Sequence, residues 1–134
     1  MTDQEALSAQ LRAMIKKGER SLKAAQRHLA DGDLDFACSK AYYAVFHLMQ
    51  AVLLTEGLTY SKHSGVLSGF SQHFIKTGRF PSDFGELIQR LRKDREVGDY
   101  GYQMNVPSED AAQDITNAQS IISKLTDFVK PFIL

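Results

Sequence analysis

The sequence predicts an all-α protein, an up-down bundle of four long helices with one shorter helix. Apolar residues recur at spacings of three and four along most of the chain, which is the period of an amphipathic helix. We find no run of alternating apolar and polar residues, bounded by turns, of the kind that forms a strand. Short connections between the helical segments favour antiparallel packing of neighbours. We therefore expect residues 1–134 to form a single helical domain.

The first helix is expected over residues 3–30. Thr2 and Glu5 have the spacing of a capping box, which satisfies two backbone N–H groups at a helix start. The apolar face consists of Leu7, Leu11, Met14, Gly18, Leu22, Ala25 and Leu29. Other faces carry a basic row, made of Arg12, Lys16, Arg20, Lys23 and Arg27, with Lys17 beside it. This row could bind phosphates, but a solvated face whose aliphatic stems cover the bundle is the commoner case.

The bundle is expected to form around a second helix over residues 34–56. Its segment from Ala41 to Leu54 is apolar almost all round, so other helices must enclose it. The segment is too short to cross a bilayer, which takes roughly 20 apolar residues. Gly57 is expected to end the helix. A polar stripe runs along it at spacings of four, four and three, made of Ser39, Tyr43, His47 and Gln50. We expect function on this stripe.

A short helix over residues 63–77 and a longer one that begins after Ser82 are expected next. Ser82 is the expected N-cap, and the longer helix should end near Gly98, before a loop over residues 99–106. Its core face consists of Phe84, Leu87, Ile88 and Leu91. Arg95 continues that face four residues beyond Leu91, and a buried arginine requires an anion or other acceptors.

The last helix is expected from Pro107 to about Lys130. Its first turn holds Glu109 and Asp110, where the helix dipole favours negative charge. Its apolar face consists of Ala111, Ile115, Ala118, Ile122, Leu125 and Val129. Pro131 is expected to end it.

Composition narrows the classes of function. The formal net charge is zero, so no overall field favours nucleic acid or membrane. The single cysteine, Cys38, cannot form an intramolecular disulfide and is expected to be a small core residue. The acidic N-terminus is unlike a signal peptide, so we expect a cytoplasmic protein without membrane contact. The histidines are too scattered for a metal site, and we expect neither metal nor cofactor.

Three segments, in this order along the chain, carry a family resemblance: SKAYYAVFHLMQAVLLTEGL, KHSGVLSGFSQHFIKTGRFP and REVGDYGY. Together they resemble the HEPN domain family, specifically its small stand-alone prokaryotic members, over about residues 10–130. The resemblance implies four long helices with a shorter fifth, usually assembled as a homodimer. It also implies binding of nucleotides or RNA, often beside a minimal nucleotidyltransferase as partner.

The resemblance also implies a candidate active centre, and here the sequence departs from the family. Many members are metal-independent ribonucleases with Arg, four to six residues, then His. Arg95 matches the Arg, but no His follows it in the sequence, and Tyr100 stands at the His position. A phenol with a pKa of about 10 is a poor general base at neutral pH. Tyr102 matches the tyrosine that is adenylylated by the partner in related toxins.

Three hypotheses follow for Arg95. We expect foremost a binding module in which a nucleotide or RNA end is held by Arg95, Asp99, Tyr100, Tyr43 and His47. The alternative is a metal-independent endoribonuclease, the toxin of a toxin–antitoxin pair, that uses Arg95 with Tyr100 or His47. In the third, Arg95 and Asp99 form only a structural ion pair, four residues apart on one helix face.

Two further segments have both a functional and a structural interpretation. Lys62, His63 and Ser64 open the third helix and could bind an anion there, although structural histidines are commoner. The Tyr42–Tyr43 pair could stack a base, although core aromatics on a buried helix are commoner.

Overall fold

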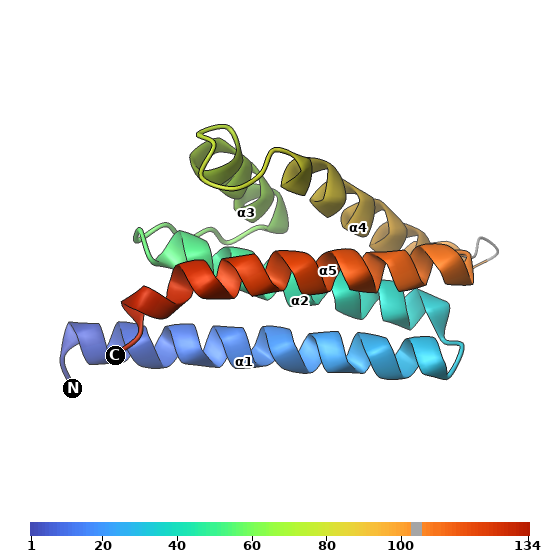
Figure 1. Cartoon of the computed structure of the whole chain (residues 1–134), viewed down its shortest axis with the longest axis horizontal. Coiled ribbons are helices and arrows are strands. Elements are labelled where there is room, and N and C mark those ends of the chain that lie inside the picture. The colour runs from blue at the N-terminus through green and yellow to red at the C-terminus, as the bar shows by residue number, and fades with distance from the viewer. Residues whose placement is uncertain (103–105) are drawn as a thin grey trace.

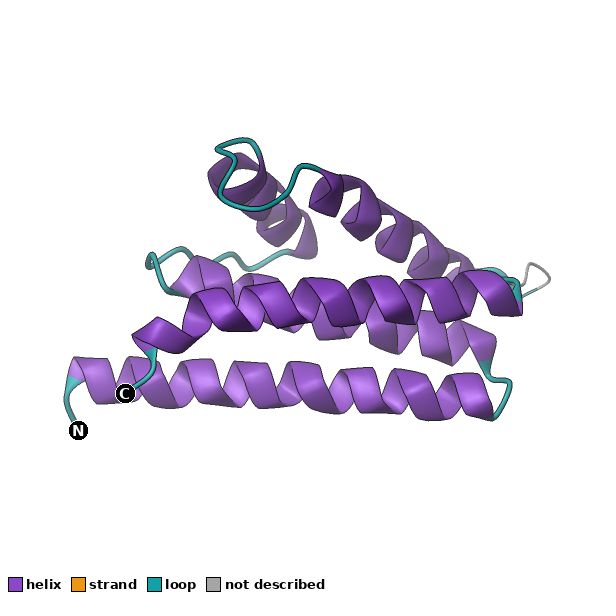
Figure 2. Ribbon diagram, in the orientation of Figure 1, coloured by secondary structure: helices purple, strands orange, loops and turns teal. Residues whose placement is uncertain are grey.

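The computed structural model describes residues 1–102 and 106–134. In these two ranges the chain forms five α-helices: α1 (Asp3–Ala30), α2 (Leu34–Leu54), α3 (His63–Phe70), α4 (Asp83–Tyr100) and α5 (Ser108–Val129). A π-helical turn, Ser71–Ile75, continues α3, and a 3-10 turn, Lys130–Phe132, follows α5. Figure 1 shows α1, α2 and α5 lying alongside one another, with α3 and α4 on one side of them. The described residues contain no strand (Figure 2), so the all-α prediction is confirmed.

The α1 helix begins as its sequence predicts and packs very closely on α2. The Thr2 side chain accepts a hydrogen bond from the Glu5 N–H, and the Glu5 carboxylate accepts one from the Thr2 N–H. Further along, a Cβ at Gly18 would clash with Cδ2 of Leu48 and lie 3.1 Å from the carbonyl oxygen of Ala44. Gly18 therefore lets the two backbones approach.

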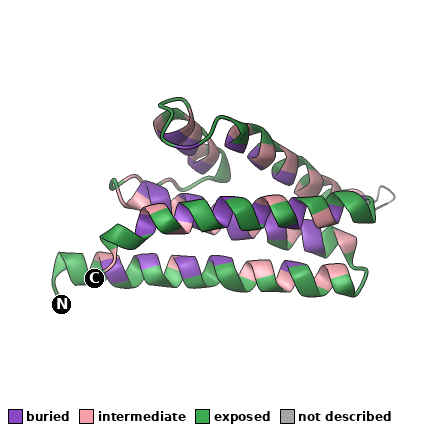
Figure 3. Ribbon diagram, in the orientation of Figure 1, coloured by how far each residue is buried: buried purple, intermediate pink, exposed green. Residues whose placement is uncertain are grey.

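The α2 helix is the buried centre of the bundle. From Ala41 to Leu53 it is buried except at Tyr43, His47 and Gln50, so the predicted polar stripe is its half-buried line (Figure 3). Helices α1, α4 and α5 all pack against it. Gly57 follows the helix with a φ of +71°, as expected for a glycine at a helix end.

The α3 helix is shorter than expected, because the chain changes to π-helical geometry at Ser71. Ser82 is the N-cap residue of α4, but its backbone is already helical and its side chain makes no capping bond to the described residues. The predicted N-cap position is therefore confirmed, but Ser82 does not make the capping hydrogen bond, which normally requires an extended N-cap residue.

The α4 helix continues to Tyr100, two residues beyond the predicted end at Gly98. Asp99 and Tyr100 are therefore helical, which corrects the prediction that a loop begins at Asp99. Gly98 serves close packing, since a Cβ there would lie 3.0 Å from the carbonyl oxygen of Asp35 on α2. Of the predicted loop over residues 99–106, residues 103–105 lie outside the described residues.

The helices of residues 1–102 and 106–134 include none that is both long enough and apolar enough to cross a membrane.

Candidate functional site

Arg95 lies on α4 and reaches across to the polar stripe of α2. Its side chain is only 15 % exposed. Nη2 donates a hydrogen bond of 2.8 Å to the Tyr43 hydroxyl, and Nε lies 2.9 Å from the Asp99 carboxylate. The guanidinium carbon lies 5.4 Å and 5.2 Å from the ring centres of Tyr42 and Tyr43, within cation–π range. The structure thus brings together three of the predicted ligand-binding residues.

The ion pair between Arg95 and Asp99 leaves hydrogen-bonding capacity unused. Nε of Arg95 is buried, and its N–H is not aligned on any acceptor among the described residues, although Asp99 is close. The Asp99 side chain is 27 % exposed, so water still solvates the carboxylate. Burial lowers the pKa of Arg95, but Tyr43 and Asp99 outweigh it, and the net pKa is raised. The site therefore holds a permanent, incompletely bonded cation.

Two histidines contact the same tyrosine. The ring centre of Tyr43 lies 6.4 Å from that of His47, one turn along α2, and 5.8 Å from that of His63 at the start of α3. The His63 ring also packs on Phe46 at 4.3 Å. The sequence analysis predicted His63 only as part of an anion site with Lys62 and Ser64. The sequence carried no signal for the contact between His63 and Tyr43, because the connection between α2 and α3 brings the two rings together.

His47 and Tyr43 also line a basic groove between α1 and α2. The groove has a volume of about 470 Å³ and is lined by Lys17, Arg20, Ser21, Ala24, Lys40, Tyr43 and His47. Burial lowers the pKa of His47, and Lys17, Lys40 and Arg20 lower it further. The imidazole is therefore neutral at pH 7, and only Arg20 of the basic row on α1 contributes to this groove.

The two predicted tyrosines beyond Arg95 lie on the surface. Tyr100 is 71 % exposed and shares with Arg95 only a shallow depression at the end of α4. Tyr102 is 99 % exposed. The tightly packed centre thus consists of Arg95, Tyr43 and the two histidines, with Tyr100 at its margin and Tyr102 open to solvent.

A buried carboxyl pair, Asp94 and Asp114, lies beside this centre and was missed by the sequence analysis. Asp114 on α5 is fully buried, and its carboxylate lies 3.2 Å from Nε of Arg90. It also accepts a hydrogen bond from the Cys38 thiol, with an S–O distance of 3.8 Å. A signal existed: Asp114 stands three residues after Ala111 and four before Ala118, on the predicted apolar face.

The pKa of Asp114 in this pair is raised. Burial raises the pKa of Asp114, and the hydrogen bond and charge of Asp94 raise it further, although Arg90 acts in the opposite direction. Burial and the nearby Asp114 raise the pKa of Cys38 to about 12, so the thiol stays protonated. Cys38 is the small buried residue that the sequence predicts. The described residues contain no group of three or more His, Cys, Asp or Glu side chains that could hold a metal ion.

The chain matches a known family over most of its length. The family model of the HEPN domain matches residues 11–128. A "UPF0332 protein" of Thermotoga maritima is 31 % identical over 86 % of this chain and 87 % of its own. The "Putative toxin MJ0142" of Methanocaldococcus jannaschii is 35 % identical over 76 % of this chain and 69 % of its own.

A solved structure shares the fold. The crystal structure of TT1696 from Thermus thermophilus superposes with a TM-score of 0.74 at 21 % identity. The match covers 88 % of this chain and 97 % of that one. At this identity the similarity shows that the two chains share the same helical fold.

The buried carboxyl pair should give the protein a measurable pH dependence. Because the pKa of Asp114 is raised in the folded state, ionisation opposes folding at pH values above the unfolded pKa of about 3.9. Relative to Asp114→Asn, the free energy of unfolding of the wild type should fall by more than about 1 kcal/mol as pH rises from 4 to 8. Urea denaturation at intervals of pH measures this difference.

Asp127→Asn is the matched control, because Asp127 lies on the same helix with a side chain that is 74 % exposed. Its stability difference from the wild type should stay constant over the same pH range. A wild type that gains stability over Asp114→Asn as pH rises would mean that Arg90 keeps Asp114 ionised.

Proposed function

Because the chain belongs to the HEPN domain family, we propose that it is a nucleotide- or RNA-binding module whose site centres on Arg95. The observation that carries the proposal is the incompletely bonded guanidinium on the core-facing line of α4. Tyr43 and Asp99 already offset the cost of burying this charge, since the pKa of Arg95 is raised, but the buried Nε–H still has hydrogen-bonding capacity for a further anion. A phosphate matches the planar donors of arginine better than those of lysine.

The surroundings of Arg95 suit a ribonucleotide. The basic groove adds Lys17, Arg20 and Lys40, which can follow a phosphate backbone beyond the first contact. Tyr43 and His63 offer ring faces and edges beside the guanidinium, and such rings stack bases without regard to sequence. These features support RNA or a nucleotide as the ligand class, with Asp99 displaced from Arg95 on binding.

We further propose a nucleotidyltransferase as a partner that modifies Tyr102. A modifying enzyme must reach its target, and Tyr102 is 99 % exposed beyond the end of α4. The relative from Methanocaldococcus jannaschii carries the name "Putative toxin MJ0142". A toxin–antitoxin pair in which the partner adenylylates Tyr102, close to Tyr100 and Arg95, would fit that name.

The protein is proposed to act as a homodimer, as HEPN domains generally do. The enclosure of α2 by helices of its own chain removes one reason for a second subunit, since its apolar faces are already covered. Support comes instead from exposed aromatic side chains at one end of the bundle. Gly98 on α4 packs against Asp35 on α2. Phe36 follows Asp35 and Tyr100 follows two residues after Gly98, so these two exposed aromatic side chains belong to the same end of the bundle.

A metal-independent endoribonuclease is the second candidate, and one observation favours it. His47 is neutral at pH 7, so it could accept the proton of a 2′-hydroxyl while Arg95 holds the phosphate. Its ring reaches the centre through Tyr43, at 6.4 Å between ring centres. Tyr100, which stands at the family's histidine position, is exposed and shares only a shallow depression with Arg95, which ranks this candidate second.

Replacing Arg95 by Met should abolish binding and leave the fold intact. Because Asp99 is partly solvated, the free energy of unfolding should change by no more than about 1 kcal/mol. Affinity for a short single-stranded RNA should fall at least about tenfold, because a charge-assisted contact is lost. Thermal melts and fluorescence anisotropy at one fixed salt concentration measure the two effects.

Lys124→Met, at an exposed position of α5, is the control, and its affinity for RNA should equal that of the wild type. If Arg95→Met is strongly destabilised and the wild type binds no RNA, the binding proposal is wrong and Arg95 serves only in the structural ion pair.

Purified protein should cleave RNA little or not at all, with or without divalent metal ions, because Tyr100 replaces the histidine. A labelled RNA ladder on a denaturing gel tests this. Strong cleavage that disappears in Arg95→Ala and His47→Asn, but persists in Tyr100→Phe, would promote the endoribonuclease and assign His47 as its base.

Sedimentation velocity at micromolar concentration should show a dimer. Phe36→Glu should shift the protein to monomer, because it places a charge on an apolar surface that the dimer would bury. Phe132→Glu is the matched control, since Phe132 is an exposed aromatic residue at the C-terminal end of the chain. A wild type that sediments only as monomer would rule the dimer out at this concentration.

A further inference from the structure

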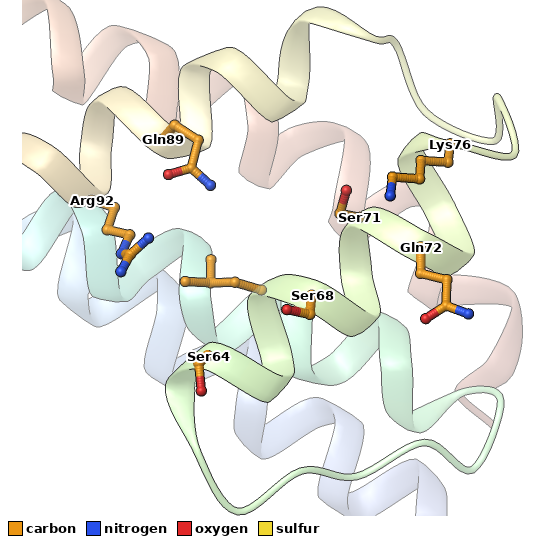
Figure 4. A pocket seen from close by; sticks show the side chains of 8 residues that line it. Ser64, Ser68, Ser71, Gln72, Lys76, Gln89 and Arg92 are labelled. Atoms are coloured by element: carbon orange, nitrogen blue, oxygen red, sulfur yellow. The ribbon is translucent and has the colours of Figure 1, made fainter.

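A second cavity lies between α3 and α4, apart from the basic groove. We call it the serine cavity. Its volume is about 400 Å³, and its lining consists of Ser64, Leu67, Ser68, Ser71, Gln72, Lys76, Gln89 and Arg92. Figure 4 shows Ser64 and Ser68 on α3, Ser71 and Gln72 on its π-helical turn, and Lys76 just after that turn. Gln89 and Arg92 lie across from them on α4. The proposed function uses none of these side chains.

The α3 helix presents three distinct faces. Val66 and Phe70 point to the core. Gly65 and Gly69 pack against Tyr60, because a Cβ at either glycine would press into the tyrosine side chain. The third face carries Ser64, Ser68 and Ser71 and faces α4 across the serine cavity. Small polar side chains on this face keep the cavity open between the two helices.

The π-helical turn brings a cation to the same face. The Lys76 N–H donates a 2.9 Å hydrogen bond to the carbonyl oxygen of Ser71, five residues earlier. This wider turn stacks Lys76 over Ser71, and Lys76 therefore lines the serine cavity together with the serines. The turn lies at the C-terminal end of α3, and Lys76 is its C-cap residue.

Arg92 supplies the second cation from the opposite wall. Its Nε lies 3.3 Å from the Glu96 carboxylate, which is nearly half exposed. The described residues accept no hydrogen bond from its terminal nitrogens. Arg92 lines the serine cavity from α4 (Figure 4). Two positive charges thus face one space, and none of the described residues that line it is acidic.

We propose that the serine cavity binds a small organic phosphate of nucleotide size, with its phosphate between Lys76 and Arg92. Hydroxyl and amide groups of Ser68, Gln72 and Gln89 then bond the polar remainder of the ligand. The volume falls in the range of small-molecule sites. A protein partner fits less well, because the centre of a protein interface is mostly apolar and this lining contains one apolar side chain, Leu67.

The test is a calorimetric titration with adenosine monophosphate, inorganic phosphate and adenosine, in the wild type and in Arg95→Met. The Arg95→Met background removes the site of the proposed function, so the two proposals fail separately. Adenosine monophosphate should bind both proteins, and adenosine should bind at least about tenfold more weakly because it lacks the charged group. In the Arg95→Met background, Lys76→Gln and Arg92→Gln should each weaken binding about tenfold.

Two further variants complete the test. Lys124→Gln removes an equal charge from an exposed position on α5 and should leave the affinity unchanged. Ser68→Leu fills the cavity and should abolish binding, with the helical circular dichroism signal retained as evidence of folding. Two outcomes would overturn the proposal. In one, adenosine monophosphate binding is lost in Arg95→Met but retained in Lys76→Gln. In the other, the wild type does not bind adenosine monophosphate at millimolar concentration.

Discussion

The enclosure of α2 is the constraint on which the rest of the structure depends. A helix that is apolar almost all round can be stable only inside other helices, and α1, α4 and α5 supply that cover. Gly18 permits the close approach of α1, and Gly98 permits that of α4. Once these faces are covered, the polar stripe is the remaining half-buried line of α2. Any functional group on the central helix must therefore lie at Tyr43 or its neighbours on this stripe, and Arg95 and His63 meet it there.

The position of Arg95 in turn depends on how α4 is fixed against α2 and α5. Phe84, Ile88 and Leu91 supply an apolar face, and the next turn places Asp94 and Arg95 side by side. Asp94 joins the buried carboxyl pair, while Arg95 turns to Tyr43. Two carboxyl groups in contact are stable in a buried position only if a proton or a cation offsets their negative charge. Here Arg90 supplies a cation, and the raised pKa of Asp114 favours its protonated form. The contacts of Asp114 with Arg90 and Asp94 therefore join α4 to α5, while the hydrogen bond from Arg95 to Tyr43 joins α4 to α2.

Sequence periodicity predicted the helices and the half-buried stripe because both follow from the local order of residues. It placed Arg95 on the core-facing line of α4 for the same reason. It predicted Asp99 as one partner of that arginine from their spacing of four. It did not predict the hydrogen bond to Tyr43, which lies 52 positions earlier and is joined to Arg95 only by the packing of α4 on α2. Tyr100 was assigned to the site by its position after Arg95 in the family signature, and its role there stays a prediction. The structure places it in the last turn of α4, where it is exposed, and the periodicity did not predict that this helix extends so far. His63 was undervalued because a tertiary contact brings it to the site. Asp114 could have been found, since it interrupts an apolar stripe at core spacing.

The two contacts of Arg95 show that its structural and ligand-binding interpretations are compatible. Tyr43 and Asp99 hold the side chain in one orientation, so little conformational entropy is lost when an anion arrives. The ion pair itself is weakly stabilising, because the Asp99 carboxylate is partly solvated and the Nε–H is not aligned on it. A phosphate that accepts from Nε therefore replaces a poor hydrogen bond by a good one, while Asp99 regains water at little cost. The bond to Tyr43 uses Nη2 and survives the exchange. In the proposed site, Asp99 thus holds Arg95 in place without competing strongly with a phosphate, so the spacing of four that predicts the ion pair is compatible with ligand binding by the same arginine.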